Sequence, residues 1–315
     1  MSADRTPADG APVAAPSVVT VGTFDGVHRG HRLVLDRLVA GARARGLRGV
    51  LVTFEPHPLY VVNPRAAPPL LSVGDEKLEA LASTGLDEVA VVPFTPQLAA
   101  YEAEQFVDAV LIQRFAMREL FIGHDHGFGR GRTGDVAVLE RLGRERGFGV
   151  HVVPPVDGRD GKPVSSTSIR RAIAGGDLAR AADGLARPYS VAGTVVHGSA
   201  RGADLGFRTL NLGALPVSKL LPPDGVYAVR AQTNSGTFGG MMNVGGRPTF
   251  DEHDRVLEAH LFDATGDWHG SRVRLDFIAR IRAVMRFAGP EELVRQLRRD
   301  EETARILLGR RGAGL

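Results

Sequence analysis

Two histidines three residues apart, His28 and His31, stand in the segment VTVGTFDGVHRGHRLVLDRL. The segment begins as a buried strand, passes through a glycine-containing loop and ends as a helix. Free N–H groups and the helix dipole make the start of such a helix attractive to anions, and Gly30 would let a phosphate or purine approach the backbone. Surface histidines or metal ligands are the alternatives, but this spacing after a strand favours a nucleotide-phosphate site.

A carboxylate in the segment VLEAHLF is the second candidate for chemistry. Strand alternation places Leu257, Ala259 and Leu261 on one face, which we expect to be the core face, and Glu258 on the other. A carboxylate between apolar neighbours needs a partner or a function. A solvated outer face explains the pattern equally well.

Short oxygen-bearing side chains occur at two further places. Thr209 and Asn211 follow a glycine-rich loop and could hold Mg²⁺ and phosphate oxygens, because Mg²⁺ prefers oxygen ligands. An ordinary turn is the alternative. The run VSSTSIRRAI at 164–173 supplies good N-caps for a helix, whose start a phosphate could share. From the residues alone, simple capping explains this run better.

The elements that must carry these residues alternate between strands and helices in the first half of the chain. Short apolar runs predict strands at 17–21, 49–54, 88–92, 119–122 and 150–153. Amphipathic patterns predict helices at 32–44, 75–83, 103–115 and 136–146. This alternation predicts an α/β fold with a parallel sheet and helices on both faces. Such sheets bind ligands at the carboxyl ends of their strands.

The pattern changes after about residue 184, where residues 184–188 have the composition of a linker. From residue 190 to 281, short strands follow one another between glycine turns, which predicts an antiparallel β-barrel or sandwich. Pro290 then suits the first position of a terminal helix, predicted at 291–308. We therefore expect a disordered tail at 1–16, one domain at 17–184 and a second domain of different class at 186–309.

The composition of the 315 residues is that of a globular protein, 43% hydrophobic and 24% charged. The absence of cysteine excludes disulfides, thiolate metal sites and cysteine nucleophiles. No run approaches the ~18 apolar residues that span a membrane, and the N-terminus lacks a secretion signal, so we expect a cytoplasmic protein without a membrane partner. A net charge of +3 with scattered arginines argues against a nucleic-acid partner. Anionic small molecules remain open, as does the oligomeric state.

The first half of the chain resembles a known family. GTFDGVHRGH is similar to the H-x-G-H signature of nucleotidyltransferases, and in its longer form to the prokaryotic FAD synthetases. FEPHP at 54–58, IGHDHGFGRGRTGD at 122–135 and VSSTSIRRAI at 164–173 match further motifs of that family in order. The resemblance covers residues 17–183 and implies a Rossmann-like FMN adenylyltransferase domain.

This resemblance implies roles for individual residues. His28 and His31 would stabilise charge on the ATP phosphates as pyrophosphate leaves. Ser166, Thr167 and Arg170 would hold the triphosphate, with Arg170 among the catalytic residues. The further residues implied in nucleotide and flavin binding are Gly22, Phe24, Asp25, Gly30, Asp125 and Phe128.

The second half resembles riboflavin kinase over residues 186–309. HGSARGADLGFRTLN, LPPDGVYAV, NVGGRPTF, LEAHLFD and MRFAGPEELVRQLRRD follow in that family's order. The resemblance makes Glu258 the general base for the riboflavin 5′-hydroxyl, and Thr209 and Asn211 ligands of Mg²⁺ and of ATP phosphates. The further residues implied in substrate binding are Gly198, Gly206 and Asn243.

Together the halves are similar to the prokaryotic bifunctional riboflavin kinase/FMN adenylyltransferase family. This implies phosphorylation of riboflavin to FMN and adenylylation of FMN to FAD, with ATP as co-substrate and Mg²⁺ as cofactor. His126 departs from the family's aromatic residue and could stack on a ring; a metal site with the adjacent His124 is disfavoured, because such close neighbours rarely share one tetrahedral ion. Arg208 and Leu210 replace Pro and Ala, which leaves open an FAD synthetase with a weakened or inactive kinase. A non-catalytic flavin- or nucleotide-binding regulator is the other alternative.

Overall fold

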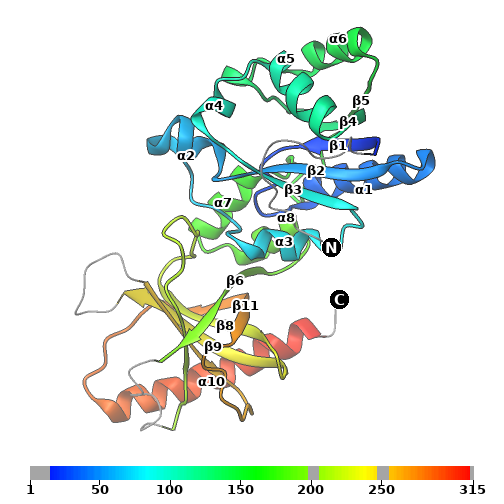
Figure 1. The fold of residues 1–315 in the computed structure, drawn as a ribbon. Helices are drawn as coiled ribbons and strands as arrows, with labels where there is room; N and C mark the ends of the chain where they lie inside the picture. The colour runs from blue at the N-terminus through cyan, green and yellow to red at the C-terminus, as the bar shows by residue number, and fades with distance from the viewer. Residues whose placement is uncertain (1–14, 198–205, 247–254, 313–315) are drawn as a thin grey trace. The chain divides into compact units, whose positions relative to one another are not determined.

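The computed structural model describes residues 15–197, 206–246 and 255–312 of the chain. The chain divides into two compact units, Met1–Ser166 and Thr167–Leu315. Figure 1 shows strands and helices mixed in the first unit and a barrel of strands in the second. The predicted combination of an α/β domain with a β-barrel and a terminal helix is confirmed.

The first unit is built on a five-stranded sheet in the order β3-β2-β1-β4-β5. All four neighbouring pairs run parallel, as the sequence predicts. Each strand begins and ends within two residues of its predicted bounds. The strands are β1 (Ser17–Val21), β2 (Arg48–Glu55), β3 (Glu88–Pro93), β4 (Met117–Gly123) and β5 (Gly149–Val153).

Helices cover both faces of this sheet. On one face, α1 (Arg29–Arg45) and α3 (Asp75–Leu81) contribute Leu35, Leu38 and Leu81 to a buried cluster. On the other face lie α5 (Ala103–Phe106), η2 (Val107–Arg114) and α6 (Val136–Arg146). The helix predicted at 103–115 thus begins as an α-helix and continues as a π-helix. Short helical turns complete the unit: α2 (Pro58–Val62), η1 (Pro64–Ala66), α4 (Pro96–Ala99) and η3 (Arg130–Arg132).

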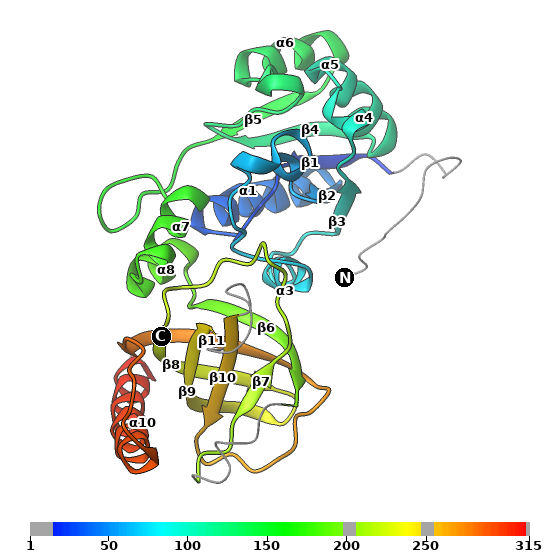
Figure 2. The same cartoon turned by 90° about the vertical axis from the view of Figure 1, so that its left-hand side faces the viewer.

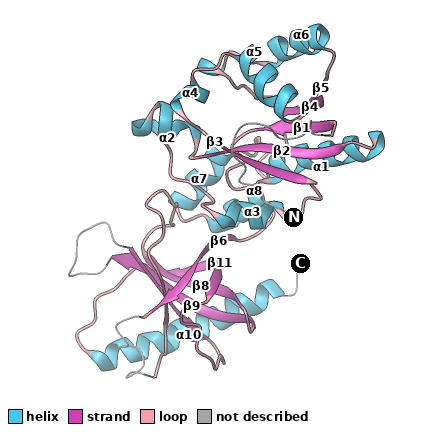
Figure 3. Ribbon diagram, in the orientation of Figure 1, coloured by secondary structure: helices cyan, strands magenta, loops and turns pink. Residues whose placement is uncertain are grey.

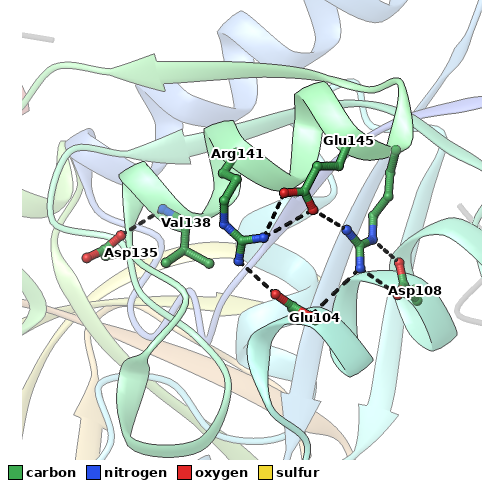
Figure 4. Close-up of polar contacts among 7 residues, drawn as sticks. Glu104, Asp108, Asp135, Val138, Arg141 and Glu145 are labelled. Carbon is green, nitrogen blue, oxygen red and sulfur yellow. Dashed lines mark hydrogen bonds and ion pairs between the residues drawn. The ribbon is translucent and has the colours of Figure 1, made fainter.

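Ion pairs join α6 to the neighbouring helical segments (Figure 4). Arg141 pairs with Glu104 at 2.7 Å and with Glu145 at 2.9 Å. Arg146 pairs with Asp108 at 2.6 Å and with Glu145 at 2.9 Å. These side chains are exposed to solvent, which screens the charges, so the pairs contribute little to stability.

The second unit contains a closed barrel in the order β10-β7-β6-β11-β8-β9, whose pairings are all antiparallel (Figure 2). The five strands predicted after residue 190 are confirmed, whereas the three-residue β7 was not predicted. The barrel strands are β6 (Tyr189–Val196), β7 (Leu210–Leu212), β8 (Gly225–Thr233), β9 (Gly236–Gly246), β10 (Arg255–Leu261) and β11 (Arg272–Arg282).

The terminal helix α10 (Pro290–Gly312) packs against β8, β9 and β11 and starts at the predicted proline (Figure 3). An ion pair fixes it to β11: Arg282 donates to Oδ1 of Asp300 from Nε at 3.0 Å and to Oδ2 from Nη2 at 2.7 Å. The Asp300 carboxylate is 1% exposed and also accepts from Gln296 at 2.8 Å. A fork of this kind is the strong form of an arginine–carboxylate contact.

Two predictions about the connecting segments need correction. The segment predicted as a linker from residue 184 is helical at its start, because α8 (Leu178–Leu185) extends through Gly184. The buried residues of α8 include Leu178 and Ala181, and the helix packs on β6 and β11. The helix before it, α7 (Ser166–Ala174), follows the serine-rich run. The tail predicted to reach residue 16 is ordered at its end, where the carbonyls of Ala15 and Pro16 accept from Arg48; residues 1–14 lie outside the described part.

Candidate functional site

The loop between β1 and α1, residues 22–28, is called the histidine loop below. It ends at His28, and His31 follows in the first turn of α1. His28 is the N-cap of α1, and its Nδ1 accepts from the backbone N–H of His31 at 3.3 Å. The helix therefore begins at Arg29, three residues earlier than predicted. With Nδ1 as the acceptor, a neutral His28 ring carries its proton on Nε2. That donor and the α1 dipole together favour an anion at this end of the sheet.

The two imidazoles are stacked, with ring centroids 3.6 Å apart and an interplanar angle of 19°. Phe24 lies against His31 from the loop, at 4.7 Å between centroids. A side chain at Gly30 would come within 3.1 Å of Cε1 of His28, so glycine at this position makes room for that ring. The predicted role of Gly30 in admitting a phosphate remains a separate prediction. A side chain at Gly22 would likewise meet the Phe24 ring at 3.2 Å.

The backbone of this loop is held in an unusual shape. Phe24 and Val27 adopt φ values of 47° and 41°, in a region that β-branched and bulky L-residues rarely enter. Gly26 has φ of 81°, and a Cβ there would lie 2.6 Å from Leu71. The buried carboxylate of Asp25 accepts from the N–H groups of Leu71 and Ser72, each at 3.0 Å. Asp25, which the resemblance implies in binding, thus binds the protein's own chain.

The serine-rich run lies beside the same loop. The hydroxyl of Ser166 donates to the carbonyl of Asp25 at 2.9 Å, and Ser166 is the first residue of α7. Thr167 and Arg170 follow on α7, within the second compact unit. The local structure therefore joins Ser166 to the histidine loop.

The glycine-rich loop after β4 exposes one of its two predicted binding residues, Asp125, and buries the other, Phe128. The side chain of Asp125 is 80% exposed. Phe128 is buried in the core of the first unit and contacts Phe106 at 5.0 Å between ring centroids. His126 meets Phe128 edge-on at 5.4 Å, so the ring contact of His126 in this structure is with the protein.

The barrel brings the predicted kinase residues together by its register. Glu258 on β10 pairs with Asn211 on β7 and with Asn243 on β9. Directly paired residues of antiparallel strands point to the same face, so the three side chains form one row across three strands. The predicted alternation is confirmed, because Leu257 and Ala259 are buried whereas Glu258 is partly exposed.

The segment before β7 adds two contacts to this row. The hydroxyl of Thr209 donates to Oε1 of Glu258 at 2.5 Å. Nδ1 of His260, two residues along β10, lies 2.7 Å from the carbonyl oxygen of Arg208. The Leu210 side chain is 7% exposed and pairs with Ala259. Gly206 adopts φ of 82°, and Gly198 lies outside the described residues.

Comparisons with known proteins cover both units. A family model for FAD synthetase matches residues 11–168, and one for riboflavin kinase matches residues 185–308. The bifunctional riboflavin kinase/FMN adenylyltransferase of Escherichia coli strain K12 is 38% identical over 294 residues, which are 93% of each chain. The protein of that name from Bacillus subtilis strain 168 is 33% identical over 92% of each chain. The chain belongs to the bifunctional riboflavin kinase/FMN adenylyltransferase family.

A solved structure supports the same fold along the whole bifunctional chain. It is described as a macrolide-efflux protein from Streptococcus pneumoniae, is 33% identical, and matches with a TM-score of 0.82 over 94% of this chain and 95% of that one. Among the described residues, no helix is long and apolar enough to cross a membrane. As a member of this family, the chain phosphorylates riboflavin to FMN and adenylylates FMN to FAD, with ATP as the second substrate.

The structure also shows residues of the bifunctional enzyme that the sequence did not single out. Lys77 on α3 reaches Thr53 at the end of β2, and the Thr53 hydroxyl reaches the carbonyl of Thr23 in the histidine loop. His260 holds the carbonyl before Thr209. Strand alternation puts His260 on the same face as Glu258, and this is the sequence signal that could have identified His260. Nothing local in the sequence marks Lys77, because its partner Thr53 lies 24 residues away.

Proposed function

We propose that Glu258 is the general base of the riboflavin kinase reaction. Its carboxylate accepts the proton of the riboflavin 5′-hydroxyl, the hydroxyl oxygen attacks the γ-phosphorus of ATP, and ADP leaves. The observation that supports this role is the position of Glu258 in one row with Asn211 and Asn243, with the Thr209 hydroxyl on Oε1. The amides supply donors for substrate oxygens, and the carboxylate is the proton acceptor of the row.

Thr209 and Asn211 suit Mg²⁺ in this proposal, because both present uncharged oxygens beside a carboxylate. No group of three or more His, Cys, Asp or Glu side chains that could hold a metal occurs in the described parts of the chain. A site of few protein ligands fits Mg²⁺, which is often bound largely through substrate phosphates. When bound, the ion neutralises phosphate charge. Gly198, Gly206 and Asn243 remain predicted binding residues.

For adenylyl transfer, we assign charge stabilisation to His28 and His31. An oxygen of the FMN phosphate attacks the α-phosphorus of ATP, and pyrophosphate leaves with the extra negative charge. The stacked rings at the start of α1 support this role, because donors and a helix dipole meet there. Arg170, Ser166 and Thr167 are proposed to hold the triphosphate on the basis of the family motif. Gly22, Phe24, Asp25, Gly30, Asp125 and Phe128 stay predicted binding residues.

A single assay tests the combined proposal: the purified chain is incubated with riboflavin, ATP and Mg²⁺. We expect FMN and then FAD to appear, with ADP and pyrophosphate as the coproducts. FAD formed from supplied FMN, but not from riboflavin, would instead support a weakened kinase. Neither product would count against both assignments.

The altered kinase motif is tested by Arg208→Pro. We expect the kinase of the natural chain to work, because the Arg208 carbonyl is held by His260 without a proline ring. Proline would fix the backbone angle further, an effect of about 0.4–1 kcal/mol, or a severalfold change in rate at most. Kinase activity that appears only in the Arg208→Pro variant would contradict this. A cytoplasmic location and the absence of nucleic-acid and membrane partners stay predictions from the sequence.

A further inference from the structure

Lys77 is a half-buried cation in the first turn of α3, close to the histidine loop. Its Nζ donates to Oγ1 of Thr53 at 3.2 Å and approaches the carbonyl of Phe54 at 3.5 Å. Arginine dominates the basic residues of this chain: only three of its 39 basic residues are lysines. A compact ammonium is thus kept where the wider, planar guanidinium used elsewhere would present a different shape.

The contact of Lys77 continues into the loop through a chain of hydrogen bonds. Thr53 is fully buried, and its hydroxyl donates to the carbonyl of Thr23 at 3.2 Å. Because a hydroxyl has one proton, it accepts from Lys77 while it donates to Thr23. The peptide that carries this carbonyl leads directly to Phe24, whose ring lies against His31. A continuous set of contacts therefore joins Lys77 to the stacked imidazoles.

The histidine loop needs such support, because its backbone is strained. Phe24 and Val27 both have positive φ values, and such conformations persist only where the surroundings hold them. Residues 71–77 hold the loop at two places. Leu71 and Ser72 donate their N–H groups to Asp25, and Lys77 acts through Thr53.

The environment of Lys77 makes its positive charge less favourable than it is in water. Burial lowers the pKa of Lys77, and the nearby carboxylates of Glu55 and Asp25 offset only part of that effect. The fold therefore carries a cation whose charged form is disfavoured at this place. An apolar side chain of similar length would avoid that cost, but it could not donate to the Thr53 hydroxyl.

We propose that Lys77 is a positioning residue for adenylyl transfer, which through Thr53 fixes the Thr23 carbonyl and with it the loop that presents His31. The inference rests on the proposed role of the two histidines. It requires no contact between Lys77 and the substrates.

The test uses the whole bifunctional enzyme and two substitutions of Thr53, which lies between Lys77 and Thr23 in the series of hydrogen bonds. Thr53→Val removes the hydroxyl at constant shape, whereas Thr53→Ser keeps it. We expect Thr53→Val and Lys77→Met each to lower kcat for FAD formation from FMN by roughly 10- to 100-fold, as small misplacements of catalytic groups do. KM for FMN and ATP should stay within about threefold, because substrate binding is not removed. Thr53→Ser should stay close to the natural enzyme.

Four controls separate this role from others. Riboflavin phosphorylation by the same variants should be unchanged, and Arg37→Met, which removes an exposed charge of α1, should leave both activities unchanged. The Lys77→Met/Thr53→Val double variant should lose no more than about threefold beyond the larger single loss, because both changes break one chain. Calorimetry should show that Lys77→Met does not lower the unfolding temperature.

The proposal would be overturned by a Thr53→Val enzyme with natural kcat, or by a loss of kcat in Lys77→Met matched by a fall in stability. Fully additive losses in the double variant would also contradict it. The His28→Ala/His31→Ala enzyme distinguishes the two levels of the argument. If that enzyme keeps FAD formation, the role of the histidines fails; if it loses FAD formation while the Lys77 and Thr53 variants keep it, only the positioning role fails.

Discussion

Replacing Glu258 with glutamine isolates the proton-accepting step of the kinase. In the natural enzyme the Thr209 hydroxyl lies 2.5 Å from Oε1 of Glu258. Glutamine keeps an oxygen that can accept from this hydroxyl. It also leaves Asn211 and Asn243 in register on either side. The substitution therefore removes one negative charge and one basic oxygen, while the shape of the row stays the same.

The expected loss follows from that single change. Removing a general base costs about 10²- to 10⁴-fold in rate, which corresponds to roughly 3–5 kcal/mol of activation free energy. The assay separates riboflavin, FMN and FAD chromatographically after incubation with ATP and Mg²⁺, and a second incubation starts from FMN. FMN formation should fall by this factor, and FAD formation from FMN should persist.

A matched control is Glu302→Gln, at an exposed position of α10 on the same unit. It should leave both activities unchanged. A Glu258→Gln enzyme that phosphorylates riboflavin within about tenfold of the natural rate would remove Glu258 from the role of base, because even a modest general-base contribution exceeds that factor.

His28→Ala together with His31→Ala should abolish FAD formation from FMN and leave riboflavin phosphorylation intact, since these histidines and Glu258 lie on different units; equal loss of both activities would refute the separation. Asp300→Asn should lower the free energy of unfolding by about 1–3 kcal/mol, because it removes the charged partner of the partly buried Arg282 guanidinium; denaturant unfolding followed by the single tryptophan measures this, and a change below about 1 kcal/mol would show that the pair is dispensable. A fragment of residues 167–315 should be more soluble and stable than one of residues 186–315, because the shorter fragment exposes the barrel surface that α8 covers; equal unfolding temperatures would contradict this.

The two architectures could be predicted from the sequence because their signals are local. Apolar runs of strand length separated by amphipathic stretches predict the parallel sheet, and consecutive strands between glycines predict the barrel. The sequence predicts a linker where α8 ends, since Gly184 and Pro188 are residues typical of loops. Its apolar side, which includes Leu178 and Ala181, has meaning only once β6 and β11 are there to cover it.

The candidate sites show the same division between local and distant causes. The helix after the histidines could be predicted to within three residues of its start, because its apolar pattern is local, although the cap formed by His28 was not predicted. The contacts of Asp25 could not, since its partners Leu71 and Ser72 lie 46 and 47 residues away. A carboxylate in a binding motif gives no sign in the sequence that it will also accept from distant N–H groups of its own chain.

The register of β10 has a consequence for how this enzyme can change over evolution. Glu258 alternates with the buried Leu257 and Ala259, so the gain or loss of one residue within the strand would turn the carboxylate inward and a leucine outward. Length changes in β10 would therefore destroy the barrel and the kinase together, whereas substitutions at Glu258 would silence the kinase alone. In a lineage supplied with FMN from elsewhere, a substitution at Glu258 would thus lead to a folded protein of unchanged length that still makes FAD.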